Sequence, residues 1–138
     1  MSRPARPEDV DEICAALPSA EFGTSWGDVP TWKVPGGDKG RGFVLYRPLH
    51  PTAVDPVTGK QYDDLLVIRT ADSADKAALV EDETTPFFTI DHFRSFNAVL
   101  VRQSRLGELS LDELTEVIHE AWLAVAPKRL SKEFLADG

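Results

Sequence analysis

The sequence is short of cysteine, of long apolar runs and of positive charge. Cys14 is the single cysteine among 138 residues, so no disulfide can form within the chain. No apolar run approaches the roughly 20 residues that span a bilayer. The positively charged N-terminal residues are not followed by the apolar stretch of a signal peptide. We therefore expect a cytoplasmic protein with no membrane partner.

Positive charge is the third deficit. Fifteen lysines and arginines stand against 23 aspartates and glutamates, which gives a net charge of −8. Nucleic-acid binding draws much of its affinity from neutralised phosphates, so this composition disfavours it unless the cations gather on one face. The hydrophobic fraction of 42% is typical of a globular domain.

Apolar periodicity predicts three helices. Val10, Ile13, Cys14 and Leu17 form one stripe over residues 8–17. A second helix is predicted to begin after an Asp72 or Ser73 cap and to run to about residue 83. The third follows a Ser110–Glu113 capping box and ends before Pro127. We expect residues 128–135 to form only a short turn.

Five segments are predicted to be strands: residues 31–34, 42–47, 64–69, 87–90 and 97–103. A glycine-rich hairpin loop joins the first two. Residues 48–63 form a long, proline-rich connection that we expect to project from the domain. Short links between neighbouring strands imply antiparallel pairing.

The element order predicts an α+β fold. It reads α-β(3)-α-β(2)-α, so we expect one antiparallel sheet with helices on one face. Residues 1–6 are expected to be a flexible lead, and residues 7–138 a single domain.

Catalytic and metal-binding patterns are missing. The glycines of "GGDKGRG" lie between two strands and do not open a helix, so they favour a hairpin over a phosphate loop. No Gly-x-Ser-x-Gly elbow is present. His50, His92 and His119 lie far apart in sequence, and no set of four metal ligands can be assembled. We expect no catalytic residues, no cofactor, no bound metal and no enzymatic activity.

Basic residues cluster at two places, around the last strand and after Pro127. Such clusters hold phosphates where they share a face; otherwise they serve solubility and offset the dipole at a helix end. The carboxylates of residues 81–83 are interpreted as solvated surface, and those of residues 112–113 as charges that favour the positive N-terminus of their helix. The two basic groups are Arg94, Arg102 and Arg105, and Lys128, Arg129 and Lys132.

Three blocks of the sequence resemble the MmcQ/YjbR-like family. They are "LPSAEFGTSWGDVPTWKV", "PFFTIDHFRSFNAVLVR" and "AWLAVAPKRL", which keep the family's order from about Val10 to Leu130. The resemblance implies a YjbR-like fold, related to secretion chaperones, with weak DNA binding and no established catalytic residues. The positions that match the family pattern are Trp26, Gly27, Pro30, Trp32, Lys33, Phe87, Phe88, His92, Arg102, Trp122, Pro127, Lys128 and Arg129.

Two tryptophans near the start allow two interpretations. Trp26 and Trp32 either pack on the core or stack bases beside a positive groove. With His92, they could also line a small pocket, and Lys33 lies next to Trp32. The leading hypothesis is a non-enzymatic protein that binds DNA weakly through Lys33 and the two basic groups. The alternative is a chaperone-like module that binds a protein or a small ligand and has no affinity for nucleic acid.

Overall fold

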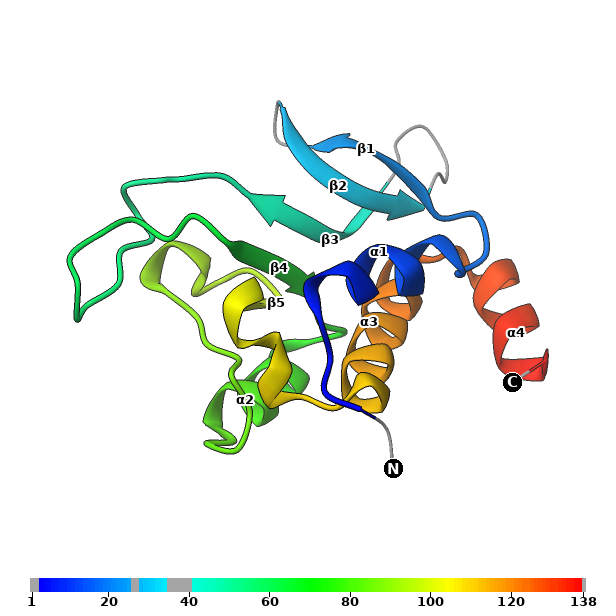
Figure 1. Ribbon diagram of the computed structural model, residues 1–138. Coiled ribbons are helices and arrows are strands. Elements are labelled where there is room, and N and C mark those ends of the chain that lie inside the picture. Colours follow the sequence, from blue (N-terminus) through cyan, green and yellow to red (C-terminus); the bar gives the residue numbers. More distant parts are fainter. Residues whose placement is uncertain (1–2, 26–27, 35–40, 138) are drawn as a thin grey trace.

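The structure is a computed structural model that describes residues 3–25, 28–34 and 41–137. The chain forms one α+β domain in which four strands follow the first helix and the fifth strand lies between helical segments (Figure 1). The elements are α1 (Pro7–Ala15), β1 (Glu21–Ser25), β2 (Val29–Val34), β3 (Arg41–Arg47), β4 (Leu65–Arg69), α2 (Ser73–Glu81), η1 (Asp91–Phe93), β5 (Ala98–Arg102), η2 (Gln103–Glu108), α3 (Leu111–Val125) and α4 (Lys128–Asp137).

The five strands form one antiparallel sheet in the order β1-β2-β3-β4-β5. Each strand pairs with the preceding one, so the sheet is a meander whose last strand returns after α2 and η1. The predicted antiparallel sheet is therefore confirmed. The predicted hairpin between β2 and β3 is seen in their pairing, whereas residues 35–40 of its loop lie outside the described part of the chain.

One face of the sheet is covered by α1 and α3, which lie together beneath it in Figure 1. The predicted stripe of α3 provides Leu114, Ile118 and Trp122, all fully buried. The Trp122 indole N–H donates to the carbonyl of Pro18 at 3.0 Å, which fixes the ring. The Ser110–Glu113 capping box that begins α3 is also confirmed.

The other face is covered by the segment around η1. Its Phe93 packs with Leu45, Val67 and Leu100 in a second apolar cluster. Lys76 of α2 ties this segment down, because its Nζ donates to the carbonyls of Phe93 at 2.6 Å and of Phe96 at 2.8 Å. No α-helix among the described residues lies in this cluster, in agreement with the prediction that helices cover one face.

Two strand predictions were wrong. Residues 21–25 form β1, which was missed because "EFGTS" is short and carries one strongly apolar residue. Residues 87–90 form no strand; Phe88 makes one isolated bridge to Leu100. The sheet therefore has four strands before α2 and one after it, and not three and two.

The ends of the chain are more ordered than the sequence predicts. Residues 128–137 form α4, a ten-residue helix, in place of the expected short turn. Its Phe134 stacks on Trp122 at 5.0 Å between ring centroids. At the other end, the described part of the expected lead is held by hydrogen bonds: Ala5 N–H donates to Leu109, and Arg3 binds Asp9. Along the described residues, no helix has the length and apolar content needed to cross a bilayer.

Candidate functional site

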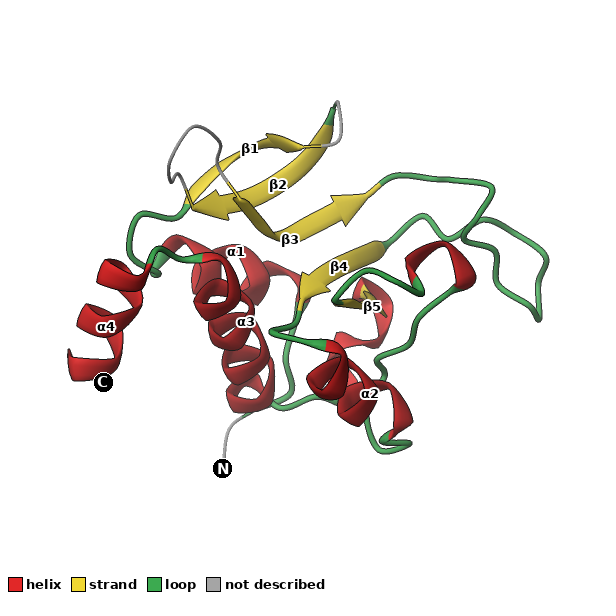
Figure 2. Ribbon diagram, turned by 180° about the vertical axis from the view of Figure 1, so that it is seen from behind, coloured by secondary structure: helices red, strands yellow, loops and turns green. Residues whose placement is uncertain are grey.

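A groove is lined by residues of α2, of α3 and of the end of β4. Figure 2 shows both helices below the sheet. The volume of the groove is about 390 Å³. The larger apolar side chains of its wall are Leu79 of α2, Phe87, Leu109 and Val117 of α3. The carboxylates that line it are Asp75, Asp82, Glu113, Glu116 and Glu120.

Helical spacing explains how α3 supplies its share of these carboxylates. Glu113, Glu116 and Glu120 are separated by three and four residues, so they lie on one face of the helix. This face is next to the buried stripe that packs on the sheet. Glu113 also accepts a hydrogen bond from Ser110 N at 2.9 Å as part of the capping box. Glu113 therefore both helps to begin α3 and places one carboxylate at the groove.

Helix α2 forms the opposite wall. Asp75 and Asp82 are seven residues apart, which places them two turns apart along this wall. Asp82 accepts hydrogen bonds from the backbone and the hydroxyl of Thr84, and these lower the pKa of its carboxyl. Arg69, at the end of β4, also lines the groove; its guanidinium lies over the Phe96 ring, 4.9 Å from the centroid.

The Arg102 network occupies a different part of the molecule. Arg102 Nε donates to Asp64 Oδ1 at 2.9 Å, its Nη1 lies 3.8 Å from Asp55, and its guanidinium stacks on Tyr62. Burial raises the pKa of Asp64, but the bonds from Arg102 and from Ser104 outweigh this, so the net pKa is lowered. These contacts bind the segment between β3 and β4 to the last residue of β5. Val57, in the middle of that segment, is 90% exposed, as expected for a projecting loop.

The remaining arginines of the first basic group also bind carboxylates. Arg105 makes a bidentate pair with Glu108, at 2.6 and 2.8 Å. Arg94 pairs with Asp91 at 3.3 Å. These pairs offset the positive charge that the predicted nucleic-acid site would need.

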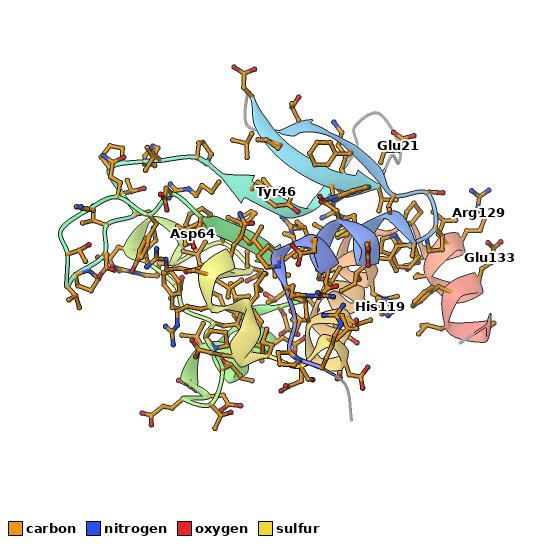
Figure 3. All side chains as sticks on the ribbon, viewed as in Figure 1. Glu21, Tyr46, Asp64, His119, Arg129 and Glu133 are labelled. Carbon is orange, nitrogen blue, oxygen red and sulfur yellow. The ribbon has the colours of Figure 1, made fainter. Side chains whose placement is uncertain are left out.

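The second basic group lies on α4, where Lys128, Arg129 and Lys132 are exposed. Figure 3 shows Arg129 at one end of the molecule and Asp64, the partner of Arg102, at the other. The structure therefore does not bring the two predicted basic groups together. Lys33 lies on β2, and its Nζ donates to the carbonyl of Thr24 at 3.0 Å.

Trp32 links the sheet to α1. Its indole N–H donates to Asp11 at 2.8 Å, and the Tyr46 hydroxyl donates to the same oxygen at 2.6 Å. Phe22, which is 56% exposed, lies edge-on to Trp32. Trp32 is half-buried against the core, which agrees with the packing interpretation.

The predicted pocket of Trp26, Trp32 and His92 stays a prediction, because Trp26 and the side chain of His92 lie outside the described part of the structure. Trp32 packs with the cluster on the α1–α3 face. His92 belongs to η1, whose neighbour Phe93 packs on the opposite face.

Among the reactive side chains that the structure describes, Cys14 is fully buried, whereas His50 and His119 are only partly buried. Burial raises the pKa of the Cys14 thiol and lowers that of His119, whose ring lies edge-on to Phe134. The hydroxyl of Thr52 lies 2.7 Å from His50 Nδ1. Within the described ranges, no group of three or more histidine, cysteine or acidic side chains is placed to hold a metal ion.

The groove was missed by sequence reasoning. The sequence interpretation takes Asp82 as solvated surface and Glu113 as a helix-capping residue, and it does not single out Glu116 and Glu120. The spacing of the three glutamates on α3 was the available signal. Its meaning depends on α2 lying opposite, which the spacing does not predict.

Comparison with known proteins agrees with this fold. The chain belongs to the YjbR family, whose model matches residues 15–124. The uncharacterized proteins Rv2570 of Mycobacterium tuberculosis and Mb2600 of Mycobacterium bovis are each 45% identical to it over 74 residues. That alignment covers 54% of this chain and 55% of each relative, so the chain spans about half the length of the curated relatives it matches.

A solved structure supports the same architecture. The crystal structure of Deinococcus radiodurans protein DR2400, with a DUF419 family-model domain, superimposes with a TM-score of 0.58. The match covers 93% of this chain and 86% of that chain at 18% identity, which shows a shared fold.

Proposed function

We propose that this YjbR-family protein is a non-enzymatic, cytoplasmic binding module whose ligand occupies the α2–α3 groove. One observation carries the proposal: an open hollow of about 390 Å³ in which apolar side chains lie beside carboxylates from both helices. This volume lies within the range of ligand pockets, which are apolar with a few placed polar groups. The charge selects a ligand that is apolar in part and positively charged.

The reactive groups described above support a binding role. Cys14 is fully buried with a raised thiol pKa, so it is a poor nucleophile. The groove holds carboxylates but no described histidine, cysteine or lysine that would complete an acid–base or nucleophilic set.

Small probes test the groove. Hexylamine, hexanol and hexanoate share an alkyl chain and differ in charge. We expect hexylamine to shift the NMR signals of Leu79 and Val117 at lower concentration than hexanol, and hexanoate to shift them least. The double variant Glu116→Gln/Glu120→Gln should weaken hexylamine binding several-fold, whereas Glu133→Gln on α4 should not. Equal responses to the three probes, or no shifts at the groove, would overturn the proposal.

DNA binding is the second candidate. Lys128, Arg129 and Lys132 on α4 support it, since none of them has an ion-pair partner within the described residues. Three contacts of this kind would give weak binding that falls steeply with salt. We expect labelled duplex and single-stranded DNA to bind at low salt through α4, and the triple Lys128→Gln/Arg129→Gln/Lys132→Gln variant to lose it. Absence of an anisotropy change at low salt rejects this candidate and leaves the groove proposal intact.

A further inference from the structure

We infer that the α2–α3 groove binds a basic amphipathic helix of a partner protein. This inference rests on the proposed function and names the partner of that same site. It follows from four features of the groove: its charge, the position of its apolar wall, the spacing of its acids and the helices that form its sides.

Charge lines both sides of the groove. Asp75 lies on α2 and Asp82 follows its last residue, while Glu116 and Glu120 lie on α3. All four are exposed at the surface. Among the described residues that line the groove, Arg69 is the one cation and faces five carboxylates, so the net charge of the groove is negative. A partner helix between α2 and α3 would therefore need lysine or arginine on both of its flanks.

The apolar wall lies between these acids. Leu79 and Val117 are half-buried and pack on the main core, while Phe87 and Leu109 are buried behind them. A ligand that fills the hollow extends this core outward. An occupant that satisfies both features has one apolar stripe flanked by cations, which is the pattern of a basic amphipathic helix.

The spacing of the acids on the α2 side of the groove agrees with a helical occupant. Asp75 to Asp82 is seven residues, which corresponds to a rise of about 10 Å in an α-helix. Two turns of a partner helix cover the same length and present apolar side chains at positions i, i+3 or i+4, and i+7. Such a stripe would lie along the apolar wall.

Backbone hydrogen bonding favours a helix over an extended peptide. An extended peptide needs a free strand edge, which offers backbone N–H and C=O groups. The groove is walled by α2 and α3 and lined by side chains, and the outer side of β5 is partly occupied by the Phe88 bridge to Leu100. A helix satisfies its own backbone groups and needs only side-chain contacts.

Two peptides of equal composition test the inference. One 14-residue peptide places leucines at helical spacing between lysines, and its partner has the same residues in scrambled order. Binding of the fluorescein-labelled peptides is followed by anisotropy. We expect the amphipathic peptide to bind at least about tenfold more tightly than the scrambled one, because only the former presents a continuous apolar stripe.

Matched variants locate the binding site. Ala78 lines the groove and is exposed, whereas its neighbour Ala77 is exposed and does not line it. Ala78→Trp should fill the groove and weaken peptide binding about tenfold or more, as expected for blocking a central contact. Ala77→Trp should change it less than twofold. Glu116→Lys with Glu120→Lys should also weaken binding, and Glu133→Lys should not.

The outcomes separate this inference from the proposed function. If hexylamine binds at the groove and the peptide does not, the inference of a helical partner is overturned and the proposed groove-binding function stands. Equal affinity for the two peptides, or binding that Ala78→Trp leaves unchanged, also overturns it. Failure of both hexylamine and the peptide to bind overturns both proposals.

Discussion

The Arg102 network and the α2–α3 groove use charge in opposite ways. In the network, one guanidinium is held by Asp64 and Asp55 and stacked on Tyr62, so its charge is neutralised within the fold. In the groove, carboxylates from both sides line the same hollow. Arg69 is the one cation among the described residues that line it. The network fastens a loop to the sheet, whereas the groove keeps its charge available to a ligand.

This difference teaches that pairing decides which charges are available for binding. The arginines around β5 were the leading nucleic-acid candidates by sequence, yet each is bound by a carboxylate. Like charges that lie together without partners reduce stability, and sites kept for binding often carry such a cost. The two regions should therefore respond in opposite directions when charges are removed.

The largest effect is expected at the network. Arg102→Gln leaves Asp64 partly buried beside Asp55 without its cation. We expect a loss of about 2 kcal/mol in the free energy of unfolding, as for a partly buried charged hydrogen bond. Urea unfolding measures this, and hydrogen exchange should increase at Tyr62 N–H, which donates to Ala53. Arg94→Gln, at a highly exposed pair, should cost less than about 0.5 kcal/mol. If Arg102→Gln and Arg94→Gln lower the free energy of unfolding equally, the Arg102 network does not stabilise the fold more than an exposed pair does.

The next largest effect is expected at Asp9, a buried acid whose contribution to stability should depend on pH. Asp9 is 2% exposed, and its bonds from Arg3 and from Arg6 N–H lower its pKa from 3.8 to about 2. A lowered pKa means that the stabilisation is present above about pH 4 and is lost as the pH falls towards 2. Asp9→Asn should reduce stability at pH 7 by about 1–2 kcal/mol, and less at pH 2. Urea unfolding at both pH values measures this. If Asp9→Asn lowers the free energy of unfolding equally at pH 7 and pH 2, the ion pair of Asp9 with Arg3 does not provide the stabilisation.

The smallest effect, and one of opposite sign, is expected at the groove. Glu116→Gln with Glu120→Gln removes like charges four residues apart. We expect stability to stay the same or to rise by up to about 0.5 kcal/mol, because like charges at this spacing are mildly destabilising. Thermal unfolding in low salt measures the change, and the gain should shrink in high salt. A clear loss of stability would show that these glutamates have structural partners.

Local signals made much of the fold predictable. The Ser110–Glu113 capping box and the apolar stripe behind it predicted α3, and the Asp72 cap predicted the start of α2. The edge strand β1 was missed because "EFGTS" is short and carries one strongly apolar residue, Phe22. Helix α4 was missed because Pro127 ends α3, and its own packing depends on Phe134 reaching Trp122.

The candidate site was less predictable for a physical reason. The groove needs α2 and α3 to lie on either side of the end of β4, which is decided by tertiary packing. The spacing of Glu113, Glu116 and Glu120 indicates one acidic face but not what lies opposite. Arg102 likewise depends on tertiary packing, because its partners Asp55 and Asp64 lie between β3 and β4, 47 and 38 residues earlier in the chain.

The most direct test is an NMR titration of the isotopically labelled protein with the amphipathic lysine peptide and, separately, with duplex DNA. The binding account predicts that the peptide shifts signals from α2, α3 and Phe87 while those of β5 and η2 stay in place. Peptide-induced shifts confined to α4, or spread evenly over the surface, would contradict the claim that the α2–α3 groove is the binding site.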